Sequence, residues 1–234
     1  CLLVVSIPAS DNEIGGELGL DAVNRMQNAI GRVESSWRPA SPDEGFEIVR
    51  RRLFEPIDPA KISTRDVVCR GFSDYYRSQS QEFPKSCSEG EYEQRLKLAY
   101  PIHPELFDRL FEDWGSLDRF QRTRGVLRLM AGVIHTLWER QDSNLMIMPS
   151  SLPIDQHSVQ SELTRYLEPV WETVIGSDVD GPQSLPLKVD RDNPNLGRFS
   201  AARRVARTIY IGSAPTLGRD NKGLDDRQIK LGCA

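Results

Sequence analysis

One long amphipathic run, residues 120–138, most strongly constrains what this chain can fold into. Hydrophobic residues recur every three or four positions along it, which is the period of an α-helix with one buried face. The side chains predicted to share that face are Phe120, Leu127, Met130, Ala131, Ile134, Leu137 and Trp138. Such a face has to be covered by other elements, and the helical patterns around it predict a mainly α fold.

Two arginines lie at the edge of the predicted hydrophobic face. Arg124 and Arg128 are one helical turn apart, and His135 follows on the same side. Guanidinium groups at this spacing suit bidentate binding of a phosphate or a carboxylate. Alternatively, both arginines pair with acidic residues at the protein surface. We expect His135 to pack beside the hydrophobic face, and Trp114 and Trp138 to lie in the core.

The chain opens with a short hydrophobic run, Cys1-Leu2-Leu3-Val4-Val5. Such a run is typical of a strand that is buried on both faces of a parallel sheet. Ser6 and Ser10 follow it, at the strand end where ligands of open α/β sheets gather. No comparable strand partner follows in the sequence, so we expect an internal piece of a longer protein whose other strands lie upstream. A helix is predicted over residues 18–30, and Arg32 lies just beyond its end.

The rest of the chain predicts helices that are joined by loops. Ser41 is a predicted N-cap, because a proline and two acidic residues follow it, as in a capped first turn. Residues 176–197 are a predicted loop, since they are rich in Gly, Pro, Asp and Asn, and residues 212–234 are predicted to be mostly loop. Residues 145–149 predict a short strand or an extended segment. The remaining predicted helices cover residues 41–54, 65–79, 92–100, 104–114, 157–174 and 198–211.

Composition narrows the class of protein. The chain is 38% hydrophobic and 27% charged, which fits a folded domain better than a disordered one. A formal net charge of −4 means that any nucleic-acid binding needs a local basic patch. No hydrophobic run approaches the roughly 18 residues that a membrane helix needs, so we expect no membrane partner. The four cysteines and three histidines are scattered along the sequence, so we expect no metal site. Widely spaced cysteines also predict reduced thiols in a cytoplasm.

The motifs of common active sites are missing from the sequence. It has no Gly-x-x-x-x-Gly-Lys-Ser/Thr phosphate loop, no hydrophobic strand ending in Asp-Glu, no Gly-x-Ser-x-Gly and no His-Glu-x-x-His. Partial features nevertheless follow one another in a specific order. A hydrophobic strand ends in polar residues, a helix ends at Gly31-Arg32, a capped helix follows, and a later helix carries Gly125-Val126-Leu127-Arg128.

That order resembles the second half of an AAA+ ATPase module. In such modules a strand ends in a polar "sensor 1" residue, the next helix ends in an arginine finger, and a helical lid carries a "sensor 2" arginine in a Gly-x-x-Arg pattern. The resemblance implies that residues 1–40 form the last part of the α/β nucleotide-binding core, one strand plus a helix. It also implies a helical lid with an insertion over residues 41–142 and a helical extension over residues 143–234. The Walker A and Walker B segments would then lie upstream of Cys1.

Longer phrases of the sequence are similar to one group within that superfamily. These are large prokaryotic AAA+ ATPases of poorly defined function, encoded beside DNA methyltransferases and helicases in phage-defence islands. The phrases that carry the similarity are residues 47–55, 100–107, 120–131 and 200–208.

The resemblance implies roles for individual residues. Ser6 or Ser10 takes the place of sensor 1, which orients the attacking water. Arg32 takes the place of the arginine finger, with Arg38 as the alternative. Arg128 takes the place of sensor 2, with Arg124 as its helper. Each residue also has a structural alternative: a serine caps a loop, and an arginine at a helix end complements the helix dipole.

The resemblance also implies cofactors and partners. The parent protein would bind ATP with magnesium and hydrolyse it as a homo-oligomeric motor or switch in DNA-linked defence. DNA-modification or helicase proteins would be its partners. This stretch alone is expected to be inactive, because nothing in it cradles the β- and γ-phosphates.

A non-enzymatic helical binding module is the alternative function. Arg203, Arg204 and Arg207 share one face of the helix predicted at 198–211, and that face could contact nucleic-acid phosphates. Such a module could instead bind a protein partner. The structural alternative is that nearby acidic residues neutralise the arginines. The acids available for this are Asp178, Asp180, Asp190 and Asp192.

Overall fold

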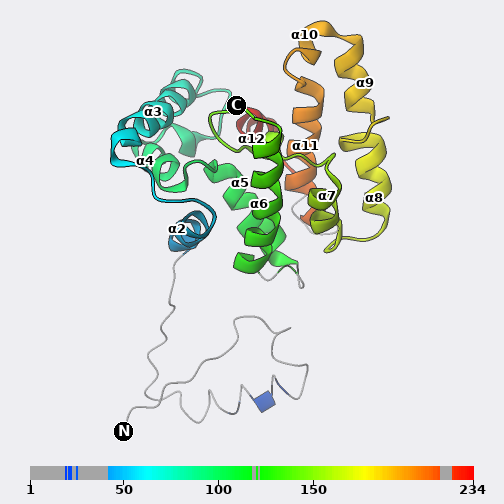
Figure 1. Ribbon diagram of the computed structural model, residues 1–234, viewed down its shortest axis with the longest axis horizontal. Helices are drawn as coiled ribbons and strands as arrows, with labels where there is room; N and C mark the ends of the chain where they lie inside the picture. Colours follow the sequence, from blue (N-terminus) through cyan, green and yellow to red (C-terminus); the bar gives the residue numbers. More distant parts are fainter. Residues whose placement is uncertain are drawn as a thin grey trace. The chain divides into compact units, whose positions relative to one another are not determined.

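The computed structural model contains the long helix that the sequence predicts, α6, which spans Arg122–Glu139 (Figure 1). Its buried side is formed by Val126, Leu129, Met130 and Val133. These positions follow helical spacing, and α2, α7 and the turns before α6 pack against the helix. The central prediction of one long amphipathic helix is therefore confirmed, although its buried side is turned from the predicted one.

Two members of the predicted hydrophobic face point to solvent instead. Trp138 is 76% exposed, and Ala131 is exposed as well. Two glycines of α6 also lie against neighbouring residues, and a hydrophobic pattern does not register them. A side chain at Gly125 would collide with the carbonyl oxygen of Phe120, and Gly132 faces Val159 of α7. The prediction that Trp138 lies in the core is therefore wrong.

The described residues are 42–117, 120, 122–216 and 223–234, together with Gly19, Asp21, Ala22 and Arg25. The chain divides into two compact units, Cys1–Ser41 and Pro42–Ala234.

In the first unit, the four described residues are helical, and Arg25 pairs with Asp21 at 2.6 Å. The predicted strand at the start of the chain lies outside the described residues. So do the three predicted catalytic residues, Ser6, Ser10 and Arg32.

The second unit is built of helices and short helical turns. Across its described residues the only β pairing is an isolated parallel bridge between Ile102 and Ile147, so the predicted extended segment at 145–149 pairs without forming a sheet. The fold is mainly α. The helices are α2 (Pro42–Leu53), α3 (Ile62–Ser78), α4 (Gly90–Ala99), α5 (Pro104–Asp108), α6, α7 (His157–Thr164), α8 (Val170–Val174), α9 (Leu185–Asp192), α10 (Pro194–Gly197), α11 (Ala201–Ser213) and α12 (Asp226–Cys233).

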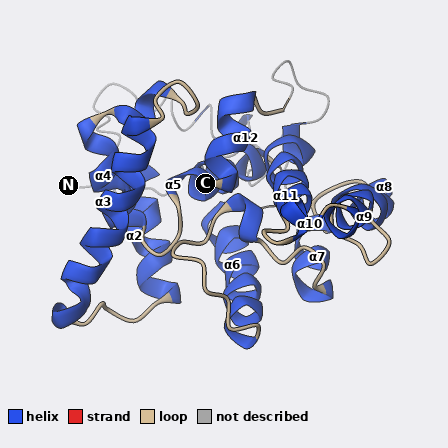
Figure 2. Cartoon of the chain, turned by 90° about the horizontal axis from the view of Figure 1, so that it is seen from above, coloured by secondary structure: helices blue, strands red, loops and turns tan. Residues whose placement is uncertain are grey.

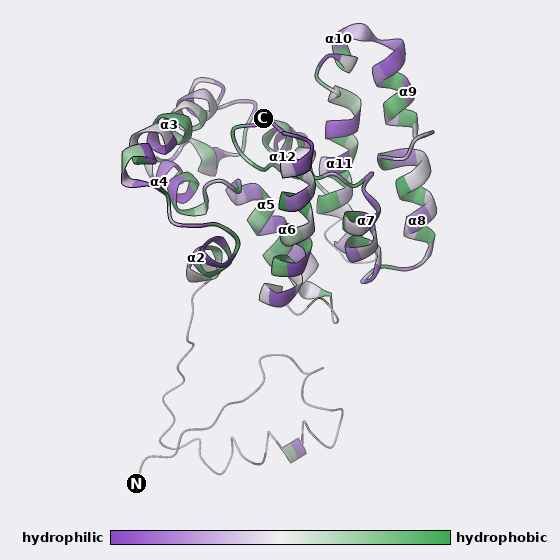
Figure 3. Cartoon of the chain, in the orientation of Figure 1, coloured by the Kyte–Doolittle hydropathy of each residue, from purple (hydrophilic) through white to green (hydrophobic). Residues whose placement is uncertain are grey.

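Within this second unit, α6 lies between two groups of helices. Helices α2, α3 and α4 lie on one side of it and α7 to α11 on the other, in both views (Figures 1 and 2). Each of the longer helices carries both hydrophilic and hydrophobic residues, as buried helices with one solvent face do (Figure 3).

One large hydrophobic cluster holds the unit together. It includes Phe107 of α5, Val126 of α6, Val159 of α7 and Tyr210 of α11. The stretches 41–142 and 143–234, which the sequence separated, thus share one core. Trp114 is fully buried in it, as predicted, and donates a hydrogen bond of 2.8 Å from its indole nitrogen to the carbonyl of Ile211.

A buried histidine joins a second, smaller cluster to the start of α5. His103 is the N-cap of that helix: its Nδ1 accepts a hydrogen bond of 3.1 Å from the backbone N–H of Glu105. Its Nε2 lies 3.0 Å from the hydroxyl of Tyr76. Since Nδ1 accepts, the proton of the neutral ring is on Nε2, which donates to Tyr76. Burial lowers the pKa of His103 to about 3, so the ring is neutral at ordinary pH.

Three predictions of local structure are corrected. The helix predicted over 157–174 is two helices, α7 and α8, with Pro169 between them. The predicted loop at 176–197 contains α9 and α10, because Pro186 and Pro194 occupy first turns, where proline starts a helix. The predicted C-terminal loop contains α12, which Asp225 and Gln228 begin with a capping box.

Candidate functional site

The exposed side of α6 brings together the residues that the sequence singled out for phosphate binding. Arg124, Arg128, Ala131, His135 and Trp138 are all exposed. Their spacing of three and four residues places them along one side of the helix. The expectation that His135 packs beside the hydrophobic face is wrong: it is exposed and lies 3.4 Å from Glu139.

The glycine of the Gly-x-x-Arg pattern has a structural reason. A Cβ atom at Gly125 would overlap the backbone carbonyl oxygen of Phe120 and crowd its ring. The chain therefore turns into α6 at a place where only glycine fits, and Arg128 follows three residues later on the solvent side. The glycine of the pattern therefore permits the close contact with Phe120, and the arginine lies on the exposed side of α6.

Arg128 pairs with an acidic residue of the next helix. Its guanidinium lies 2.9 Å from Oε1 of Glu162 on α7, and its side chain is 46% exposed. Arg165 shares the same oxygen at 3.2 Å. The second oxygen, Oε2, is buried and has no hydrogen-bond partner among the described residues. Two cations thus share one incompletely bonded carboxylate, which leaves a local net positive charge.

The pair between Arg128 and Glu162 is of the kind that breaks at little cost. Exposed ion pairs contribute about 0–1 kcal/mol, because water screens the charges and both side chains lose freedom. A phosphate would offer Arg128 a stronger, bidentate partner. The arrangement therefore allows Arg128 to exchange a carboxylate of its own chain for a phosphate oxygen.

The basic side of α11 has a different environment. Arg203 and Arg207 pair with Asp180 at 2.6 and 2.7 Å, and the Asp180 side chain is fully buried. Both arginines also lie 3.7 Å from Asp155, which Arg140 holds with two hydrogen bonds of 2.9 and 3.1 Å. This five-residue group, the Asp180 cluster, joins α11 to the end of α6 and to the segments before α7 and α9.

The charges of the Asp180 cluster stabilise one another. Burial works to raise the pKa of Asp155, but the hydrogen bonds from Arg140 and the nearby Arg207 and Arg203 hold it below the ordinary value. The backbone N–H of Asp155 also donates to Asp180 at 3.0 Å. Three arginines and two aspartates make a connected network, so these arginines have a structural role in the fold.

The remaining arginine of α11 also contacts its own chain. Arg204 lies with its Nε 3.3 Å from the hydroxyl of Ser150. Two hydrophobic side chains of α11, Val205 and Ile209, are exposed. Of the acids expected to neutralise this helix, Asp180 pairs with two arginines, and Asp190 accepts hydrogen bonds from two backbone N–H groups of its first turn.

Several residues of these groups were missed from the sequence. Glu162 and Arg165, three positions apart on one helix, give a weak signal of an ion pair, but nothing predicts that Arg128 joins it. Arg140 and Asp155 give none, because each is an ordinary charged residue near a helix end. Within the described ranges, no group of His, Cys, Asp and Glu side chains is placed to hold a metal ion. None of the described helices is long and apolar enough to cross a membrane.

Comparison with known proteins assigns a family without an activity. Residues 40–224 match the family described as DUF499 second domain. No curated protein and no solved structure matches the chain significantly. Because the family match covers most of its length, the chain belongs to the family of DUF499 second domains.

Proposed function

We propose that this chain is the lid-side portion of an ATP-hydrolysing AAA+ motor or switch that acts in DNA-linked defence. Arg128 is the residue that contacts nucleotide phosphate, with Arg124 one turn before it. The observation that carries the proposal is the partly exposed Arg128, which shares the Glu162 carboxylate with a second cation, Arg165. The Gly-x-x-Arg pattern and the mainly helical fold support the same reading.

The other elements of the proposal follow from the resemblance to AAA+ proteins. ATP with magnesium is the proposed cofactor. Ser6 or Ser10 orients water, and Arg32 reaches the nucleotide of a neighbouring subunit in a homo-oligomer. The chain's own contribution is positive charge: guanidinium groups stabilise the charge that develops on a transferred phosphoryl group.

The test compares the two arginines that share Glu162 in the full-length protein. Arg128→Ala should lower ATP turnover at least about tenfold, because it removes a phosphate contact. Arg165→Ala is the matched control, since it removes the other cation from the same carboxylate. Unchanged turnover in Arg128→Ala, or equal losses in both variants, would refute the role of Arg128.

A helical module that binds a protein partner is the second candidate. Several large hydrophobic side chains of α9 to α11 and the turn between them are exposed: Leu185, Leu196, Phe199, Val205 and Ile209. Exposed hydrophobic residues in one region are typical of interaction surfaces. A full-length protein that binds no ATP, while the isolated unit still binds a partner protein through this region, would favour this candidate over the first.

A further inference from the structure

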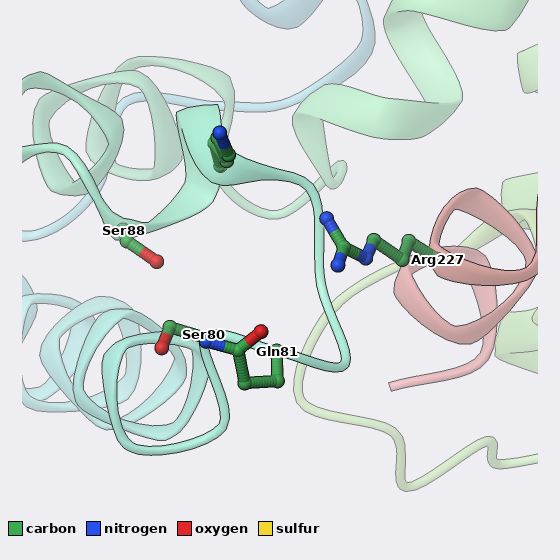
Figure 4. Close-up of a pocket in the computed structure, with 5 residues that line it drawn as sticks. Ser80, Gln81, Ser88 and Arg227 are labelled. Atoms are coloured by element: carbon green, nitrogen blue, oxygen red, sulfur yellow. The ribbon is translucent and has the colours of Figure 1, made fainter.

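A cavity opens between the C-terminal helix and the loop that follows α3. It has a volume of about 210 Å³ and is lined by Ser80, Gln81, Lys85, Ser88 and Arg227. Arg227 extends from α12 toward the space, and the hydroxyl of Ser88 faces it from the opposite side (Figure 4). Parts of the chain more than a hundred residues apart thus build one polar site, called here the α12 cavity.

The charge of the α12 cavity is positive. Lys85 and Arg227 are cations, the other lining residues are neutral, and no carboxylate of the described residues lines the space. Four acidic residues lie nearby in sequence, and two of them, Glu82 and Asp226, are paired with Lys230 at 2.6 Å. The Asp225 carboxylate accepts the capping hydrogen bond from the backbone N–H of Gln228. Among the described residues, neither Lys85 nor Arg227 forms an ion pair. Two unpaired cations beside a space of this size favour an anion.

A second, independent observation concerns Ser88. Its hydroxyl oxygen is buried and has no hydrogen-bond partner in the described part of the chain. An unsatisfied buried hydroxyl costs about 1–3 kcal/mol, so native structures rarely leave one. A ligand oxygen in the cavity would satisfy it. The hydroxyl of Ser80 and the side-chain amide of Gln81 offer further hydrogen bonds at the exposed edge.

We propose that the α12 cavity binds the phosphoryl group of a small phosphorylated molecule. Arg227 binds two of its oxygens through the guanidinium fork, Lys85 contributes a second positive charge, and Ser88 donates a hydrogen bond. The ligand links α12 to the segment before α4, to which the pair of Lys230 with Glu82 already tethers it. This site does not depend on the ATPase proposal.

The test is calorimetric titration of the 234-residue chain with inorganic phosphate, ribose 5-phosphate and acetate. Saturable binding of phosphate or of the ester is expected, with acetate at least about tenfold weaker. Arg227→Gln and Lys85→Gln should each weaken binding about tenfold or more, and Ser88→Ala by a smaller factor. Tighter binding of ribose 5-phosphate than of phosphate would identify an ester as the ligand.

Lys188→Gln on α9 is the matched control, since it makes the same change of charge away from the cavity. It should leave binding unchanged. Thermal melting of each variant verifies that it is folded, which is expected because none of the substituted side chains is in the hydrophobic core. The proposal is overturned if no binding is seen up to about 10 mM phosphate, if acetate binds equally well, or if the control loses as much affinity as Arg227→Gln.

Discussion

Asp180→Asn tests whether the basic side of α11 is structural. The Asp180 carboxylate is fully buried and accepts hydrogen bonds from the Nε atoms of Arg203 and Arg207, at 2.8 and 2.7 Å. The substitution keeps the shape of the side chain but removes its charge. Two guanidinium groups then lose their closest counter-charge while they remain largely buried, Arg207 being only 11% exposed.

The expected loss of stability follows from this geometry. Removing one partner of a buried ion pair costs about 3–5 kcal/mol, because the remaining charge is left uncompensated. Asp155 lies 3.7 Å from both arginines and compensates in part. We therefore expect a loss near the lower end, about 3 kcal/mol. Domains are stable by only about 5–15 kcal/mol, so this loss is large.

Urea unfolding at neutral pH, followed by circular dichroism, measures the effect. Asp178→Asn is the matched control, because Asp178 is exposed and, among the described residues, its carboxylate accepts a hydrogen bond only from the neighbouring Ser177. The control should change the free energy of unfolding by less than about 0.5 kcal/mol. If Asp180→Asn and Asp178→Asn lowered the free energy of unfolding equally little, the ion pairs of Arg203 and Arg207 would not stabilise the fold. That result would favour a role of these arginines in binding nucleic acid.

Three further predictions concern other parts of the chain. Gly125→Ala should destabilise the unit by about 1–3 kcal/mol, because the new methyl group meets the carbonyl of Phe120. The control Gly71→Ala, in open space on α3, should be neutral or stabilising. Urea unfolding measures the free energy of unfolding of both variants. Burial lowers the pKa of His103 from 6.5 to about 3, so the unfolded chain takes up this proton first. The free energy of unfolding should therefore fall as pH drops from about 6.5 to 3, and a His103→Gln variant should show a shallower fall in melting temperature. Mixing Arg32→Ala subunits with subunits defective in Walker A should restore part of the ATPase activity; mixed oligomers that stay inactive would exclude a finger acting between subunits.

The helices of this fold are largely predictable from local sequence. The long helix at 120–138, the helix that begins at Pro42 and the burial of Trp114 follow from the spacing of hydrophobic residues and from proline in a first turn. The predicted N-cap, Ser41, lies outside the described residues. The prediction of a loop at 176–197 failed because proline can either end a helix or occupy its first turn. Pro186 and Pro194 lie in the first turns of α9 and α10. The capping box of Asp225 and Gln228 could have predicted the start of α12. The composition of residues 212–234 favoured a loop instead.

The candidate site was less predictable, because distant residues decide it. Which side of α6 is buried depends on the close approach at Gly125, and this left Trp138 exposed. The partner of Arg128 is Glu162, 34 residues later, and Arg203 and Asp180 are 23 residues apart. Charge and helical spacing identified the arginines of α6 and α11 as candidate binding residues. Only the three-dimensional structure separates the exposed Arg128 from the largely buried Arg207.

The central claim is that Arg128 exchanges Glu162 for a nucleotide phosphate. Its most direct test is the dissociation constant for ATP in the full-length protein, measured with a fluorescent nucleotide for two variants with opposite expectations. Glu162→Gln frees Arg128 from its carboxylate and should tighten ATP binding by up to about fivefold, the equivalent of one exposed ion pair. Arg128→Ala removes the phosphate contact and should weaken ATP binding. If Glu162→Gln left the affinity unchanged or weakened it, and Arg128→Ala had no effect, Arg128 would be a surface residue paired with Glu162 and nothing more.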